Sequence, residues 1–148
     1  MIEHLVARCG VYRMLFPSEN VGDIRPLPEF VRLSPVKIRR TVPVVLDLRV
    51  YLGVPAPDCG VRMGWHSTDG ARRVDLVLDE VEAIVHCGPG DRRPTPMLPP
   101  RLRLLCDGAM PDSQGRFRLC IRPDTALPVS SPRDRRDVLA ALRFEEMP

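Results

Sequence analysis

A chain of 148 residues is long enough to form one globular domain that buries a core without disulfides or a metal. Its net charge of +3 is too small to indicate binding to nucleic acid or to a membrane surface by itself, and 44% hydrophobic residues with 28% charged residues exclude wholesale disorder. Only Lys37 among the 22 basic residues is a lysine, and this arginine bias along the whole chain indicates a GC-rich bacterial genome.

The five cysteines are odd in number and have no close paired spacing, so they predict free thiols in a reducing compartment and neither a disulfide framework nor a metal site. The first ten residues lack the basic and apolar regions of a signal peptide. No window approaches the roughly 20 apolar residues of a membrane span. We therefore expect a cytoplasmic protein without membrane insertion.

Two short apolar runs, at 5–7 and 11–16, have the spacing of a tight β-hairpin. Ser18 then offers an N-cap for a single helical turn, which would place Val21 and Ile24 three residues apart on one face. Extended chain follows this turn because prolines come next.

The longest regular pattern is the alternation of apolar residues that begins at Val42. Period two predicts a strand from Val42 to about Leu48 with one buried face, followed by a turn, and Val45 indicates that the middle of the strand is covered on both faces. Asp47 and Gly53 also fit the N-cap and the end of a short helix, which is the alternative to the turn. Asp47 is expected to form a structural ion pair with Arg49.

Further alternation predicts strands in the second half of the chain, at 61–65, 74–78, 101–106 and 116–122. Residues 80–85 are expected to be extended or to form one turn, and 86–100 to be a proline-rich loop. The last two strands would form a hairpin through the loop 107–115, with five arginines on its outer face.

The last segment of the sequence contains residues that are typical of the N-terminus of a helix. Ser131 is a candidate N-cap, Pro132 fits the first helical position, and an apolar stripe follows. About eight short strands, no βαβ rhythm and one terminal helix indicate an all-β, mainly antiparallel barrel architecture.

The order of four segments resembles the CheW-like domain of bacterial chemotaxis. The segments are YRMLFPSENVGDI, VPVVLDLRVYLG, VDLVLDEVEAIV and RFRLCIRPDTAL, and the match runs in the family's order over about 5–127. The resemblance implies two small SH3-like five-stranded barrels packed around a shared core, with a CheW-like domain at 1–130 and a C-terminal helical tail at 131–148.

The same resemblance implies a non-catalytic adaptor that couples a chemoreceptor to the regulatory domain of a CheA-like histidine kinase. It places partner-binding roles on the positions that match the family's contact segments, namely Val21, Asp23, Ile24, Arg39 and Val77. The family's N-x-R-G element before the central strand is not in register here, so Arg39 would take the place of its arginine only through a one-residue shift of the loop.

Two other classes of function remain as alternatives. The histidines His4, His66 and His86 are scattered, and the neighbours His86 and Cys87 would point to opposite sides of an extended chain, so we expect no catalytic centre, metal or cofactor. A basic barrel that binds nucleic acid would need exposed aromatic residues, and the chain has only seven aromatics. The adaptor is therefore the predicted function, with a nucleic-acid-binding barrel or a small enzyme as alternatives.

Overall fold

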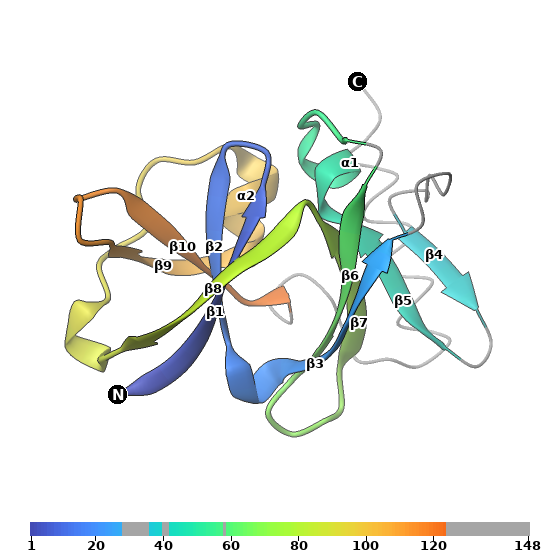
Figure 1. The fold of residues 1–148 in the computed structure, drawn as a ribbon, viewed down its shortest axis with the longest axis horizontal. Coiled ribbons are helices and arrows are strands. Elements are labelled where there is room, and N and C mark those ends of the chain that lie inside the picture. The colour runs from blue at the N-terminus through green and yellow to red at the C-terminus, as the bar shows by residue number, and fades with distance from the viewer. Residues whose placement is uncertain (28–35, 40–41, 58, 124–148) are drawn as a thin grey trace.

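The structure is a computed structural model that describes residues 1–27, 36–39, 42–57 and 59–123. These residues form ten β-strands in two five-stranded sheets that lie side by side, together with two short α-helices (Figure 1). The predicted all-β class and its division into two five-stranded units are confirmed.

The first sheet contains the two ends of the described chain. Its strands, in spatial order, are β8 (Glu80–Cys87), β1 (Ile2–Cys9), β2 (Tyr12–Pro17), β10 (Phe117–Ile121) and β9 (Cys106–Pro111). β2 and β10 run parallel, and the other neighbouring pairs are antiparallel. The hairpin predicted near the N-terminus is β1 and β2, and Gly10 in its turn has the left-handed conformation (φ 61°) that glycine adopts without strain.

The second sheet is built from the middle of the chain. Its strands, in spatial order, are β3 (Val21–Leu27), β6 (Gly60–His66), β7 (Arg73–Leu78), β5 (Val42–Asp47) and β4 (Val36–Arg39). β5 and β7 run parallel, whereas the other pairs are antiparallel. Val45 predicted that the middle of this strand is covered on both faces, and β5 is indeed an interior strand with Val45 buried. The middle position of the sheet, however, belongs to β7.

The hydrophobic core has one large cluster and two small ones. The large cluster draws on both sheets and includes Met14, Phe16, Leu46, Trp65, Leu76, Leu119 and Ile121. Each sheet also has a small cluster on its opposite face, because neighbouring strand residues point to opposite sides: one surrounds Leu15 and the other joins Val45 to Val77. The two sheets therefore share a core, as predicted.

The chain passes from the second sheet to the first at Asp79, between β7 and β8. The backbone N–H of Asp79 donates to the carbonyl oxygen of Arg8 at 3.0 Å, and its Oδ2 accepts the N–H of Gly10 at 2.9 Å. Its Oδ1 lies 3.9 Å from Nη1 of Arg49. The crossing is thereby attached both to the β1–β2 hairpin and to the helix that follows β5.

That helix is α1 (Leu48–Leu52), and it corrects the prediction of a turn after the strand. β5 ends at Asp47, whose Oδ1 accepts the N–H of Arg49 at 3.0 Å, and Gly53 ends the helix in the left-handed conformation (φ 68°). An N-cap carboxylate and a C-terminal glycine are the usual boundaries of a helix. The short helix between Asp47 and Gly53, which the sequence analysis gave as the alternative to a turn, is therefore the correct prediction.

Arg49 is buried at the start of α1, and its side chain is only 4% exposed. Its Nε donates to Oδ1 of Asp47 at 3.2 Å, and its Nη1 donates to the carbonyl oxygens of Pro57 and Cys59 at 3.2 and 2.8 Å. The predicted structural pair of Asp47 and Arg49 is present, and it also fixes the loop that leads into β6.

The predicted strand at 101–106 is wrong, because residues Pro100–Leu105 form the helix α2. Leu102 and Leu105 are buried while Leu104 is 47% exposed, which is the three-residue spacing of a helix face. The following residues, predicted as loop, form β9, which pairs with β10. The face of five arginines is therefore absent, since Arg101 and Arg103 belong to α2.

The single turn predicted at Ser18 is also corrected. Residues Ser18–Asn20 form a 3₁₀-helix (η1) without a side-chain cap, and Val21 already begins the strand β3. In the proline-rich segment, Pro89–Asp91 form a second 3₁₀-helix (η2), and Arg93 bridges to Ala109 of β9. The C-terminal helix predicted at 131–148 and the boundary at residue 130 lie outside the described residues.

Candidate partner-binding surfaces

Three of the predicted partner-binding residues lie on β3, an edge strand of the second sheet. The side chain of Asp23 is 82% exposed, and Ile24 is 42% exposed. Val21 is partly buried and packs against the large core cluster. The register between β3 and β6 shifts between Val21 and Ile24, so a bulge interrupts the strand at this point. We call the exposed stretch from Gly22 to Pro26 the β3 edge.

The two other predicted residues are not part of the β3 edge. Val77 is fully buried in the small cluster with Leu27 and Val45, so its side chain is a core group and is not presented to a partner. Arg39 ends β4, where its backbone pairs with Val42, and its side chain is not among the described ones.

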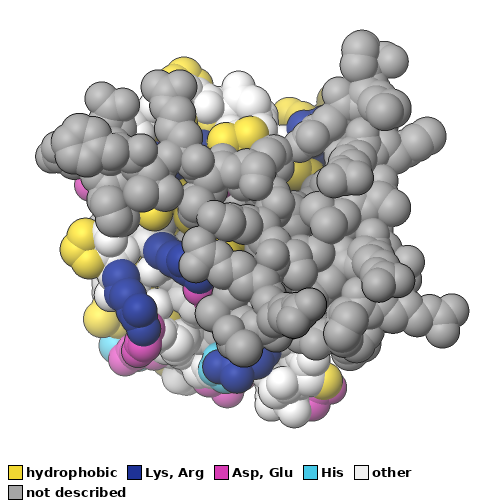
Figure 2. Space-filling view, turned by 90° about the vertical axis from the view of Figure 1, so that its right-hand side faces the viewer, with side chains coloured by type: hydrophobic (Ala, Val, Ile, Leu, Met, Phe, Trp, Pro, Cys, Tyr) yellow, Lys and Arg dark blue, Asp and Glu magenta, His cyan; other side chains and the backbone are white. Residues whose placement is uncertain are grey.

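Charges along the β3 edge and its neighbours are paired. Asp23 lies 3.1 Å from Nη2 of Arg25, and Asp75 of β7 lies 2.7 Å from Nε of Arg62 on β6. Figure 2 views the molecule from the side of the second sheet, and in the part of that face that is described, basic side chains lie next to acidic and histidine side chains. Positive and negative side chains are therefore mixed in the described part of this face.

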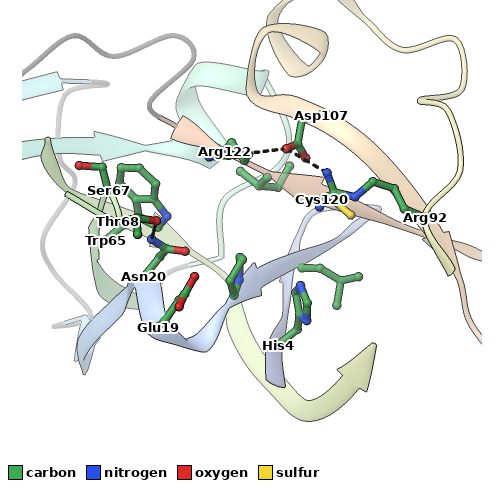
Figure 3. A pocket seen from close by; sticks show the side chains of 13 residues that line it. His4, Glu19, Asn20, Trp65, Ser67, Thr68, Arg92, Asp107, Cys120 and Arg122 are labelled. Carbon is green, nitrogen blue, oxygen red and sulfur yellow. Dashed lines mark hydrogen bonds and ion pairs between the residues drawn. The ribbon is translucent and has the colours of Figure 1, made fainter. Parts of the chain in front are cut away.

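A polar cleft of about 120 Å³ lies between η1 and the β6–β7 turn on one side and β9 and β10 on the other (Figure 3). Asp107 is central to one wall, where its Oδ2 accepts from Arg92 and Arg122 at 3.3 and 3.4 Å. Asn20 on the other wall donates to the carbonyl oxygen of His66 at 2.9 Å. The cleft is therefore held by polar contacts from both sheets.

Some polar groups that line this cleft are buried. His4 is 4% exposed, and its Nδ1 donates to the carbonyl oxygen of Ile2 at 3.0 Å. Oδ1 of Asp107 is buried without a hydrogen-bond partner in the described part of the chain. Because these side chains come from separate segments, no spacing in the sequence brings them together, and sequence reasoning did not find the cleft.

The thiols lack the properties of catalytic nucleophiles. Burial, with the nearby carboxylates of Asp79 and Asp47, raises the pKa of Cys9 to about 12. Burial also raises the pKa of Cys120 to about 11. Both thiols are therefore protonated near neutral pH, and a protonated thiol is a poor nucleophile.

Among the described residues, no group of three or more histidine, cysteine or acidic side chains could hold a metal ion. None of the helices in the described ranges is both long enough and apolar enough to cross a membrane.

The fold defines an all-β class in which two five-stranded sheets share one core. A similar solved structure is the scaffolding protein TtCheW from Thermoanaerobacter tengcongensis, with a TM-score of 0.62 and 12% sequence identity, and the similarity covers 87% of this chain and 94% of that chain. No family model and no curated protein sequence matches the chain. The chain therefore has a CheW-like fold.

Proposed function

We propose that this protein is a non-catalytic cytoplasmic adaptor of chemotaxis-type signal transduction, which couples a chemoreceptor to the regulatory domain of a CheA-like histidine kinase. The observation that carries the proposal is the similarity of nearly the whole fold to a CheW scaffolding protein. The four sequence segments that resemble the family occur in the same order, which supports it independently of the fold comparison.

The β3 edge supports the choice of a binding surface. An edge strand leaves half of its backbone N–H and C=O groups without a partner in the sheet, so it can pair with another chain. Ile24 adds an exposed apolar side chain, and Asp23 adds a charge that makes no contact with the core. We infer that one partner contacts Asp23 and Ile24.

The test is a titration of the full chain with purified kinase regulatory domains and purified receptor signalling tips from the source bacterium. Asp23→Arg is expected to weaken the binding of one partner by at least about tenfold, since a like charge opposite a complementary surface is strongly unfavourable. Its free energy of unfolding should stay within about 0.5 kcal/mol of the parent, because Asp23 is exposed.

Glu80→Arg is the matched control. Glu80 is also exposed on an edge strand and also pairs with an arginine, since its Oε1 lies 3.1 Å from Nη2 of Arg8, but it belongs to the first sheet. This variant should keep the affinity that Asp23→Arg loses. The proposal fails if no kinase or receptor domain binds, and the assignment of the surface fails if Asp23→Arg and Ile24→Ala both bind like the parent.

A further inference from the structure

The two edge strands of the first sheet, β8 and β9, approach each other across a second cleft of about 190 Å³. Val85 and Cys87 of β8 line one side, and Met110 of β9 lines the other. Leu15, from the small core cluster of this sheet, forms an apolar floor. We call this feature the edge cleft.

The two strands that border the edge cleft, β8 and β9, differ in whether their backbone groups are free to pair with another chain. On β9, Ala109 already exchanges two backbone hydrogen bonds with Arg93, at 2.7 and 3.0 Å, and Pro111 has no N–H to donate. β8 pairs only with β1, so the backbone groups on its other edge have no partner strand among the described residues. The free edge of β8 is therefore the side on which another extended chain can pair.

Arg118 of β10 places a guanidinium in the edge cleft, on the sheet face that also carries Cys120. Its Nε is buried without a hydrogen-bond partner, and Arg118 makes no ion pair with any described residue. An unsatisfied buried donor costs free energy, more so when the group is charged. The carboxylate of Asp112 is near enough for its charge to interact with Arg118, but no acidic group among the described residues lies at ion-pair distance, so another molecule could supply a direct acceptor.

The acidic groups of the cleft are already engaged with the backbone. Oδ2 of Asp91 accepts the N–H of Gly88 at 2.8 Å. Oδ1 of Asp112 accepts the N–H groups of Arg116 and Gln114 at 2.9 and 2.8 Å, and these hydrogen bonds, together with the nearby charges of Arg118 and Arg116, hold the pKa of Asp112 below its usual value. Among the described residues of the cleft, Nε of Arg118 thus remains buried without a hydrogen-bond acceptor.

We propose that the edge cleft binds an extended peptide segment of a partner protein, which pairs with the free edge of β8 and places an Asp or Glu carboxylate against Arg118. The apolar floor accepts side chains two positions away from that acidic residue, because residues i and i+2 of a strand share a face. This site is separate from the β3 edge and does not depend on the partner proposed there.

The probe is a displayed library of random seven-residue peptides, selected on the full chain. The selected peptides are expected to carry an acidic residue at one position with apolar residues two positions from it. Arg118→Gln should weaken their binding by about tenfold or more, since it removes a charge-assisted hydrogen bond. Arg103→Gln, which changes an exposed arginine on α2, is the matched control and should bind like the parent.

Cys87 gives a second readout because its thiol lines the cleft and is only partly buried. A bound peptide should slow alkylation of Cys87, measured by mass spectrometry, while alkylation of the exposed Cys59 stays unchanged. Thermal unfolding of Arg118→Gln should resemble that of the parent, so that weaker binding is not a loss of fold.

The proposal is overturned if no peptide is enriched, if the peptides show no preference for an acidic residue, or if Arg118→Gln binds them like the parent. Unprotected Cys87 in the peptide complex would also overturn it. Complete competition by free glutamate at equal concentration would assign the cleft to small carboxylates in place of a peptide strand. Asp23→Arg should leave peptide binding intact, so failure here is distinguishable from failure of the proposed adaptor function.

Discussion

Arg49 is a charged side chain in the protein interior, and the contacts that surround it offset the free-energy cost of burying its charge. Its Nε and Nη2 donate to the carboxylate of Asp47 at 3.2 and 3.4 Å, and its Nη1 donates to two backbone carbonyl oxygens. Removing one partner of a buried ion pair leaves an uncompensated charge. The pair therefore matters for the position of α1 and of the loop before β6.

We predict that Asp47→Ala lowers the free energy of unfolding by about 3 to 5 kcal/mol, because it removes the carboxylate nearest to the buried Arg49, leaving only the more distant Asp79 at 3.9 Å among the described residues, and also removes the N-cap of α1. Urea denaturation followed by circular dichroism is the measurement. Asp23→Ala is the control, since Asp23 pairs with Arg25 in solvent and should cost less than about 0.5 kcal/mol. Equal losses in the two variants would contradict this account of the buried pair.

Because of Cys9, the free energy of unfolding is expected to change with pH in the alkaline range. Its pKa in the folded state is about 12, above the ordinary thiol value of 9.0, so the folded protein keeps the thiol proton when the unfolded chain has already lost it. The unfolded state then binds fewer protons than the folded state, and stability falls as pH rises above about 9.

We predict that Cys9→Ala flattens this decline by up to about 1.4 kcal/mol per pH unit between about pH 9 and 11. Denaturant unfolding of both proteins across that range measures the two slopes. Cys59→Ala is the control, because Cys59 is exposed and should leave the slope unchanged. Parallel slopes for Cys9→Ala and the parent would show that Cys9 is not the group responsible.

At the scale of elements, α1 shows how local signals set a boundary. Gly53 ends the helix with φ 68°, a conformation in which a Cβ atom is strained, although nothing lies within 4 Å of the position that a Cβ would occupy. A substitution here therefore tests backbone conformation without a steric clash.

We predict that Gly53→Ala lowers the free energy of unfolding by about 1 kcal/mol, because alanine is strained in the left-handed region. Gly90→Ala is the matched control: its Cβ would also meet nothing within 4 Å, but Gly90 is not among the glycines with positive φ. The control should be neutral or slightly stabilising. If the two variants unfold at the same denaturant concentration, the left-handed cap is not what ends α1.

α2 shows where local pattern fails. Over six residues, apolar positions at 102 and 105 can be taken as part of a helix face, and those at 102 and 104 as part of a strand face. The structure buries Leu102 and Leu105 under the large cluster and leaves Leu104 half exposed. Packing against the other elements therefore decides the conformation, and Pro100 at the start of the helix agrees with it.

At the scale of the whole molecule, several of the described arginines form ion pairs with carboxylates of other segments. Four of them lie within 3.4 Å of an acidic side chain that belongs to a different segment, namely Arg8, Arg13, Arg62 and Arg92. Pairing of this kind reduces the positive charge that these four side chains present to a phosphate. The excess of arginine in the composition is thus consistent with a protein-binding surface of mixed charge.

We predict that binding to nucleic acid is weak and nonspecific, so that any affinity for a DNA duplex falls steeply between about 50 and 200 mM salt. Fluorescence anisotropy with duplexes of unrelated sequence is the measurement. Tight binding to one sequence that persists at the higher salt concentration would reverse the ranking of functions and favour the nucleic-acid alternative.

The sequence by itself determined the all-β class and most of the strands, because these follow from period-two alternation, and it offered Asp47 and Gly53 as the boundaries of a helix only as the alternative to a turn. Only the tertiary structure decided that Val77 is a core residue, that α2 is a helix and that β8 and β9 face each other across the edge cleft. The physical reason is that these features depend on which segments pack together, and contacts between residues distant in the chain leave no periodic trace in the sequence.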